Sequence, residues 1–402
     1  MLNIVIVVIA LSVGAYLALA PRVSRSTSWQ ATVTPLASIM GSGFLVSAPL
    51  LGGVVGIWAV FCMAVLLALA YLIGSAIRFN IRYFEPLEGQ NHDAANHTAF
   101  LSRLVLAGAY FISISYYLQL LAAFVLGATG VQSDIAANLL SSALLLTIGT
   151  VGIWRGLDAL GRIEKYAVAL NLGMITALIV ALIVYNTNLF TSGDWQLPAV
   201  DSSIEWNDIR VLLGLLIVVQ GFEASRYLGD QFSPQIRISS MRRAQLISAA
   251  IYLVFIALAT VLFHPDMGGD VTAIIEMTQP VAVVLPLLLT VAAVGSQFSA
   301  AVADTEGAGG LVEEISERKL PIRYAYLLIL LVTLTLTWET DVNAIIAYAS
   351  RAFALYYALQ CVVALLVAYQ QPRAPARSRR LLLFGMLGLL ALLVFMLGIP
   401  SE

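Results

Sequence analysis

Residues 31–52 (ATVTPLASIMGSGFLVSAPLLG) form an apolar segment that is long enough to cross a bilayer but is interrupted near its centre. The interruption is the run GSG at 41–43, and the segment also carries Pro35 and Pro49. A helix that unwinds here frees backbone N–H and C=O groups, which the hydrocarbon region tolerates only where protein or a cavity satisfies them. Discontinuous helices that meet near the midplane form the binding sites of many secondary transporters. The segment therefore predicts a membrane carrier.

The composition is typical of a polytopic membrane protein. Apolar residues make up 60% of the 402 positions and charged residues only 11%, and apolar runs long enough to span a bilayer recur along the chain. We therefore predict an all-α polytopic membrane protein with about 12 transmembrane helices. The predicted spans are 2–20, 30–51, 54–77, 104–128, 135–153, 165–187, 208–230, 242–263, 280–304, 321–338, 343–370 and 379–398.

Basic residues favour one side of the predicted membrane. All of the 21 Lys and Arg residues except Arg210 and Arg351 fall in or beside every second connection, beginning with the one after span 2–20. The positive-inside rule then places these connections in the cytoplasm and both termini outside, in a multi-pass protein of the plasma (inner) membrane. Span 2–20 lacks a basic n-region and is too long for a typical h-region, so we expect it to be retained as a helix.

The chain contains two sets of five spans, which we predict to be inverted structural repeats. An odd number of spans per set gives the two sets opposite orientations, and each set opens with an interrupted helix, at 41–43 and near Gly221. Corresponding interruptions in two halves point to a transporter binding site. The predicted units are an additional N-terminal helix (1–29), a first repeat (30–187), an external loop (188–207), a second repeat (208–370) and a C-terminal helix (371–402).

The first break offers two kinds of helix end to a ligand. The half-helix before it ends in exposed carbonyls, which suit a cation, and the half-helix after it begins with free N–H groups, which suit a carboxylate. Glycine permits the unwound torsions and lets a ligand approach the backbone. The alternative is that these small residues only allow close helix packing. The substrate-binding candidates here are Ser38, Ile39, Gly41, Ser42 and Gly43.

Polar residues also interrupt the seventh span. Gln220, Gly221 and Glu223 lie in its middle, where a carboxylate is costly. We expect Glu223 to face a cavity, to bind a cation or to be protonated, which makes it a candidate proton carrier or gate. The alternative is a structural carboxylate that is bonded to the freed backbone amides. All three residues are substrate-binding candidates.

Arg351 is the only basic residue deep within an apolar run. It lies ten residues after Asp341, roughly 15 Å along a helix, which is too deep for its side chain to reach the outer surface fully. We expect it to form a charge pair, with Glu223 as the first candidate, or to contact an anionic substrate. The alternative is pairing with helix-end carbonyls.

Hydroxyls on the ninth span are candidates for holding an ion. Ser296 and Ser299 lie one turn apart, and such hydroxyls, with the carbonyls of a broken helix, can replace the hydration shell of a small cation. Serines also make ordinary interhelical hydrogen bonds. Asp304 and Glu306 lie near the predicted cytoplasmic end of this span, so we expect them to be solvated. The fourth span could also supply pocket walls through Tyr110, Ser113, Tyr116, Tyr117 and Gln119, of which Tyr110 and Ser113 are substrate-binding candidates. The alternative is that the tyrosines are packing residues or membrane-interface anchors.

Two runs resemble the amino acid–polyamine–organocation (APC) superfamily. IMGSGFLVSAP (39–49) and GFEASRYLGDQFSPQIRISSMRRAQ (221–245) are similar to its broken first and sixth core helices. In that group a G-x-G lies in the first helix, and a G-F-E is followed by an acidic residue and a P-x-x-R segment, here Asp230, Pro234 and Arg237. The resemblance implies the LeuT-type five-plus-five inverted-repeat fold with two discontinuous helices, and alternating-access transport of a small organic solute.

The additional N-terminal span and the run AAVGSQFSAAVADTEGAGGLVEE (292–314) resemble the solute:sodium symporter family. Sodium-coupled relatives imply a Na+ site between carbonyls of the first broken helix and hydroxyls of this run. Two adjacent hydroxyls are usual there, and Gln297 departs from that pattern. The ion-site residues that the resemblance implies are Ala37, Met40, Ala293, Ser296, Gln297 and Ser299.

Proton-coupled relatives often place a lysine within the fifth core helix. Lys165 lies only at the predicted cytoplasmic start of that helix here, and Asn171 is the polar residue further in. This argues against a lysine-based switch, whereas a carboxylate such as Glu223 remains available for protons.

Together these features predict a cation-coupled secondary active transporter for a small polar organic solute, such as an amino acid, with sodium slightly preferred over protons. The alternatives are a proton-coupled permease or exchanger of the same fold and a non-transporting solute-sensing module. The expected partners are the solute and the lipid bilayer, with no nucleic acid and no cofactor beyond a possible Na+. Because no nucleophile–base or metal constellation occurs, we do not expect an enzyme.

The predicted topology can be checked with a reporter fused after Glu402. Because the spans are even in number and the basic connections are assigned to the cytoplasm, we expect a periplasm-active alkaline phosphatase to be active at this position. A fusion in the basic connection after span 54–77 should be inactive. Inactivity of the fusion after Glu402, or activity of the second fusion, would contradict the twelve-span topology.

Overall fold

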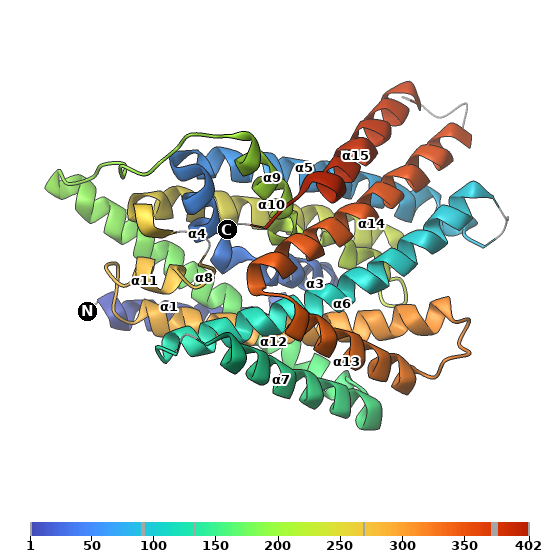
Figure 1. The fold of residues 1–402 in the computed structure, drawn as a ribbon, viewed down its shortest axis with the longest axis horizontal. Coiled ribbons are helices and arrows are strands. Elements are labelled where there is room, and N and C mark those ends of the chain that lie inside the picture. The colour runs from blue at the N-terminus through green and yellow to red at the C-terminus, as the bar shows by residue number, and fades with distance from the viewer. Residues whose placement is uncertain (1, 90–92, 132, 268–269, 371–376, 401–402) are drawn as a thin grey trace.

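The computed structural model describes residues 2–89, 93–131, 133–267, 270–370 and 377–400, and this part of the chain contains helices and no strand. The longer helices run roughly along the long axis of the molecule (Figure 1). The α-helices are α1 (Leu2–Leu19), α2 (Pro21–Ser24), α3 (Thr27–Gly41), α4 (Phe44–Val55), α5 (Ala59–Tyr83), α6 (Ala94–Ala128), α7 (Asp134–Arg155), α8 (Asp158–Ser192), α9 (Trp206–Gly214), α10 (Pro234–Ala259), α11 (Ile274–Thr278), α12 (Leu285–Ile315), α13 (Ile322–Glu339), α14 (Val342–Gln370) and α15 (Arg377–Leu397). The short 3-10 segments are η1 (Gly56–Trp58), η2 (Glu85–Leu87), η3 (Leu216–Val219), η4 (Phe222–Tyr227), η5 (Thr260–Leu262) and η6 (Pro265–Met267).

Ten helical stretches in the described residues are long and apolar enough to cross a membrane. One of them, Thr27–Leu87, contains two of the predicted spans, 30–51 and 54–77. The predicted span 208–230 is not among the ten, because it is divided into the short segments α9, η3 and η4. The helical segments therefore agree with the predicted all-α polytopic membrane fold.

The first four helices of one set of five pack on the corresponding helices of the other set. The second helices of the sets, α5 and α10, are in contact, and so are the third helices, α6 and α12, and the fourth, α7 and α13. The interrupted first segments of the two sets are also in contact, because α3 touches both η3 and η4. Figure 1 shows α7 and α13 side by side along one edge of the bundle, and α15 lying on α14 away from them. This pairing is what a pseudo-twofold relation between the sets produces, as in the predicted LeuT-type fold.

The first break lies where it was predicted, but glycine serves a different purpose there. α3 ends at Gly41 and α4 begins at Phe44, and Gly43 between them has an extended backbone with φ of 171°. Its torsions are therefore open to any residue, and space is the reason for glycine. An added Cβ would lie 2.6 Å from Cγ1 of Val218, in η3. Gly43 thus allows the two interrupted segments to touch.

The second break is longer than predicted. Nothing between the end of α9 at Gly214 and the start of α10 at Pro234 is α-helical. Gly221 separates η3 from η4 and has φ of 110°, a conformation that strongly favours glycine. An added Cβ there would also lie 2.6 Å from the carbonyl carbon of Ser38. The backbones of the two breaks are therefore in direct contact.

Two helices extend by ten or more residues beyond one end of their predicted spans. α6 begins at Ala94 where the span was predicted to begin at 104, and α12 ends at Ile315 where the span was predicted to end at 304. Hydropathy finds the apolar part of a helix and misses turns that carry charged residues, although these turns keep their backbone hydrogen bonds. The extension of α12 changes the environment of Asp304, as described below.

The additional N-terminal helix packs closely along α8. At Gly173 of α8, an added Cβ would collide with the carbonyl of Ala10 and lie 2.8 Å from the backbone nitrogen of Gly14. Small residues let helix backbones approach in this way, and packing and weak contacts then hold the helices together in lipid.

We expect Gly173→Ala to lower the free energy of unfolding by about 1–3 kcal/mol, because the added methyl group must push α1 away from α8. The measurement is thermal unfolding of the purified protein in detergent. Gly310→Ala is the matched control, since it also places alanine in a helix but has no atom within 4 Å of the added Cβ. Equal melting temperatures for the two variants would show that the close contact between α1 and α8 does not contribute to stability.

Candidate functional site

The backbone groups that the two breaks release are bonded within the protein. Tyr252 of α10 donates its hydroxyl to the carbonyls of Ile39, at 3.1 Å, and Val218. Ser42 donates its hydroxyl to the carbonyls of Ile39, at 2.9 Å, and Gln220, at 3.3 Å. Each of these two side chains thus joins the end of α3 to the backbone around η3. The freed carbonyls, which suited a cation in the sequence, are occupied by hydroxyl donors here.

The start of α4 is closed to solvent. Tyr116 of α6 donates its hydroxyl to the Ser42 carbonyl at 2.8 Å, and the Gln220 amide donates to the Tyr117 hydroxyl at 3.2 Å. Ser42 and Gln220 are at most 1% exposed. Together with Val218 against Gly43, these contacts leave no open space at the N–H end of the half-helix.

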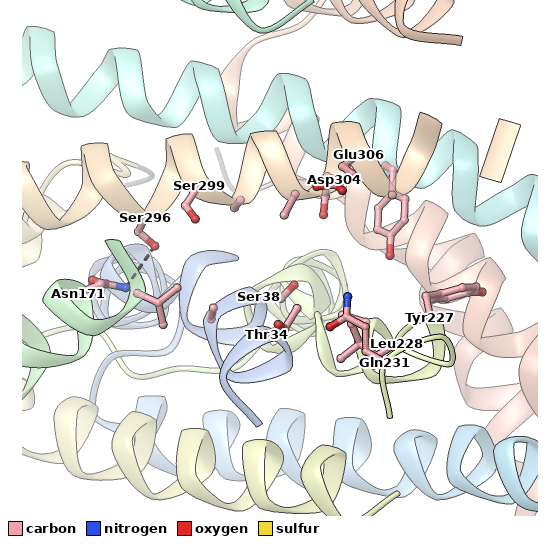
Figure 2. Close-up of a pocket in the computed structure, with 17 residues that line it drawn as sticks. Thr34, Ser38, Asn171, Tyr227, Leu228, Gln231, Ser296, Ser299, Asp304 and Glu306 are labelled. Carbon is pink, nitrogen blue, oxygen red and sulfur yellow. Dashed lines mark hydrogen bonds between the residues drawn. The ribbon is translucent and has the colours of Figure 1, made fainter. Parts of the chain in front are cut away.

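A cavity of about 400 Å3 lies on the other side of α3, between this helix, α8, α12 and the segment that begins with η4. Figure 2 shows Asn171 and Ser296 at one end of the cavity and Tyr227, Leu228 and Gln231 at the other. Of the predicted site residues, those that line it are Ala37, Ser38, Tyr110, Ser296 and Ser299. Those that do not are Ile39, Met40, Gly41, Ser42, Gly43, Ser113, Gln220, Gly221, Glu223, Ala293, Gln297 and Arg351.

Glu223 lies away from this cavity and bonds to the protein itself. The backbone N–H of Gly221, at 3.0 Å, and the hydroxyl of Tyr357, at 2.7 Å, both donate to its Oε2. The Tyr357 ring also stacks on Phe222, with ring centroids 5.1 Å apart. Of the two interpretations of Glu223, the geometry matches the structural carboxylate that caps a freed backbone amide.

The predicted pair between Arg351 and Glu223 is not formed in the described part of the chain. Arg351 Nε instead donates to the carbonyl of Phe395, at 2.8 Å, and the guanidinium lies 5.7 Å from the centre of the Phe395 ring. Phe395 is close to the end of α15, where carbonyls lack partners within the helix. The prediction of a charge pair was therefore wrong, and the alternative of a helix-end carbonyl describes the contact.

Amide side chains occupy positions around the implied ion site. Gln297 donates its Nε2 to the carbonyl of Gly41, at 2.9 Å, and Asn171 of α8 donates its Nδ2 to the Ser296 hydroxyl, at 3.3 Å. The Gln297 Oε1 is buried and accepts no hydrogen bond from the described residues. Gln297 thus bonds a carbonyl at the end of the first broken helix. The side chain of Lys165 lies outside the described residues.

Asp304 of α12 is a cavity residue that the sequence analysis placed in solvent. It is only 9% exposed, lines the cavity and accepts a hydrogen bond from the hydroxyl of Ser113. Because α12 continues to Ile315, Asp304 lies eleven residues inside the helix, roughly 16 Å from its end. The expectation of a solvated Asp304 was wrong for this reason. Glu306 lines the cavity and is exposed, as expected.

Ion pairs line a second pocket, which shares Tyr227 with the cavity. Arg237 of α10 binds Glu85 with two hydrogen bonds of 3.0 and 2.6 Å, and the Arg226 guanidinium lies 3.8 Å from carboxylate oxygens of both Glu85 and Glu88. Arg103 of α6 binds Glu88 at 2.7 Å. Arg237, the arginine of the P-x-x-R segment, therefore links the start of α10 to the connection between α5 and α6. Spacing in the sequence gave no signal for these partners.

Comparison with known proteins agrees with this architecture. A family model described as an APC superfamily transporter matches residues 21–398. The chain belongs to the APC superfamily of transporters. The predicted resemblance to this superfamily is thereby confirmed. A protein of Aquifex aeolicus (strain VF5), described as an uncharacterized protein, is 44% identical to this chain over 360 residues. The match covers 88% of the present chain and 87% of the Aquifex protein.

Solved structures with a similar fold include manganese transporters of Eremococcus coleocola. A histidine-to-alanine mutant of that transporter has a TM-score of 0.59 at 12% identity. The match covers 92% of the present chain and 86% of the transporter chain. A complex with an aromatic bis-isothiourea substituted compound has a TM-score of 0.57 at 13% identity, with coverage of 92% and 87%. Identities this low show the fold alone. The described residues of the present chain contain no group of three His, Cys, Asp or Glu side chains placed to hold a metal ion.

The structural role of Glu223 can be tested by substitution. Both donors bond to the same oxygen, so the single amide oxygen of Glu223→Gln can accept both, and we expect its melting temperature to stay close to that of the wild type. Glu223→Leu strands two buried donors and should cost about 2–4 kcal/mol of stability. Thermal unfolding of both variants is the measurement. Equal losses in the two variants would contradict a capping role.

Proposed function

We propose that this APC superfamily protein is a cation-coupled secondary transporter that moves a small polar organic solute by alternating access. The observation that carries the proposal is the cavity of about 400 Å3, because its walls include residues from both interrupted segments. Ala37 and Ser38 belong to α3 before the first break, and Ala224 and Tyr227 belong to η4 after the second. Pockets of a few hundred Å3 suit small organic molecules.

The two sides of the breaks differ in a way that supports alternating access. Tyr116, Tyr117 and Val218 close the space beside the start of α4, whereas the cavity has an exposed rim that includes Gln231 and Glu306. The rim lies beside the ion pairs of Arg103 and Arg237, on the side of the basic connections. With those connections in the cytoplasm, as we propose, this conformation opens inward.

For the coupling ion, the contacts favour protons over sodium. The Gly41 carbonyl and the Ser296 hydroxyl already accept hydrogen bonds from amide groups of Gln297 and Asn171, so a sodium ion would have to share these oxygens with the amide donors. Asp304 is a buried carboxylate on the cavity wall and can take up or release a proton there. Sodium is a second candidate because the buried Gln297 Oε1 has no donor among the described residues, and an amide oxygen can bind a cation.

Uptake into proteoliposomes under separate proton and sodium gradients would test the proposal. We expect a radiolabelled solute, selected by thermal shift from amino acids and amines, to accumulate when a pH gradient is imposed. An imposed sodium gradient should have little effect. Accumulation that follows only the sodium gradient would assign the coupling to sodium.

Ser296→Ala separates the two ions further. If sodium were coupled, removal of this hydroxyl should raise the half-saturating sodium concentration at least tenfold, about 1.4 kcal/mol. Ser75→Ala is the matched control, since Ser75 bonds to the carbonyl of Leu72 within α5 and is not part of the cavity wall. Solute binding without flux under any gradient would contradict transport and favour a sensing module.

A further inference from the structure

A groove of about 480 Å3 lies on the surface of the bundle, where α14 runs between α6 and α15 (Figure 1). Its walls come from 105–112 of α6, 348–355 of α14 and Phe395 of α15. Within these walls, Gly108 and Tyr348 are exposed. Each of the three helices is long and apolar enough to cross a membrane, so the groove opens to lipid when the protein is in a bilayer.

Arg351 is the only charged residue among the described residues that line the groove. Its Nε donates to the carbonyl of Phe395, whereas the four N–H donors of its terminal nitrogens have no hydrogen-bond partner in the described part of the chain. The Phe395 ring, 5.7 Å away, carries no net charge that could neutralise the guanidinium. Arg351 lies nine residues after the start of α14, roughly 14 Å along the helix, where an unpaired charge is costly. An anion in the groove lowers this cost.

A second arginine adds positive charge close to the groove. Arg210 of α9 donates its Nε to the carbonyl of Leu397 at 3.2 Å, two residues beyond Phe395. Arg210 and Arg351 are the two basic residues that lie outside the basic connections. The end of a helix carries only about half a negative charge, and neither guanidinium pairs with a carboxylate of the described residues. The last turn of α15 therefore lies in an excess of positive charge.

The rest of the groove suits a hydrocarbon chain. Apart from Arg351 and Tyr348, the side chains that line it are apolar. At Gly108 an added Cβ would meet no atom within 4 Å, so the groove is open there. Tyr348 lies one turn before Arg351 on α14, and its exposed side chain can donate a hydroxyl to an anion at the guanidinium. A ligand that fits both parts of the groove has an acidic group and an apolar tail.

We propose that this groove binds an anionic phospholipid, with its phosphate against the Arg351 guanidinium and an acyl chain along the apolar wall beside Gly108. Guanidinium groups bind phosphate oxygens with two parallel hydrogen bonds, and a bilayer thins locally around an arginine at this depth, which brings the phosphate within reach. No described acidic residue lines the groove to receive a head-group ammonium, so a lipid with net negative charge is favoured over a zwitterionic one. The inference does not depend on the proposed transport function.

Native mass spectrometry of the purified full chain tests the lipid class. Dioleoylphosphatidylglycerol and dioleoylphosphatidylcholine share their acyl chains and differ in net charge. We expect the first bound phosphatidylglycerol to have a dissociation constant at least tenfold lower than the first bound phosphatidylcholine. Glycerol 1-phosphate, which lacks acyl chains, and oleate, which lacks a phosphate, should not displace phosphatidylglycerol at equal concentration. Equal affinity for the two lipids, or displacement by either competitor, would overturn the proposal.

Substitution of Arg351 tests whether its charge holds the head group. We expect Arg351→Gln to weaken the binding of phosphatidylglycerol at least tenfold, to the level of phosphatidylcholine. Arg155→Gln is the matched control, since it removes an exposed arginine at the end of α7, away from the groove, and should change the affinity less than threefold. Unchanged affinity in Arg351→Gln, or equal losses in the two variants, would contradict the assignment.

Gly108→Leu tests the acyl-chain part of the site and serves if Arg351→Gln does not fold. The added side chain fills the groove while the bond between Arg351 and Phe395 stays in place, so we expect at least tenfold weaker binding of phosphatidylglycerol. Gly310→Leu is the control, because an added Cβ there also meets no atom within 4 Å and Gly310 does not line the groove. Full affinity in Gly108→Leu, or the same loss in both variants, would place the lipid elsewhere.

Discussion

The structure depends on how backbone groups are satisfied where two membrane-crossing segments lose their helical hydrogen bonds. Lipid offers no donors or acceptors, so each carbonyl and amide released at the breaks needs a protein partner or a cavity. Tyr252, Ser42 and Tyr116 bond the carbonyls, and Glu223 bonds the amide of Gly221. Ser42 directly follows α3 and Glu223 belongs to η4, and both of these elements contribute to the cavity wall. The same contacts that make the breaks tolerable therefore fix the position of the site.

These contacts also divide the site into a closed and an open part. The hydroxyl bonds gather on the side of α4 and η3, where small residues and close packing exclude any ligand. The side facing α12 keeps its space, and its carboxylate and hydroxyl groups point into the cavity (Figure 2). The broken helices thus mainly form part of the cavity wall, and their backbone groups at the breaks are bonded within the protein.

Much of the fold could be predicted from the sequence, and less of the site. Apolar runs and the spacing of basic residues are local properties, so the spans and the break at Gly41–Gly43 could be found. The partners of Arg351 and Glu223 depend on which helix faces turn toward each other, and no periodicity in a single sequence records that. Asp304 was missed because an apolar window ends a helix too early when its last turns carry charge. Its burial follows from the continuation of α12 beside α6.

The Tyr252 phenol has one proton to offer and two carbonyls to receive it, one from each interrupted segment. In the present arrangement the acceptors share it. A displacement that separates the segments leaves the phenol with a full bond to one of them, so the enthalpy lost on one side is partly regained on the other. A single side chain can in this way keep one hydrogen bond whether the two interrupted segments stay together or separate.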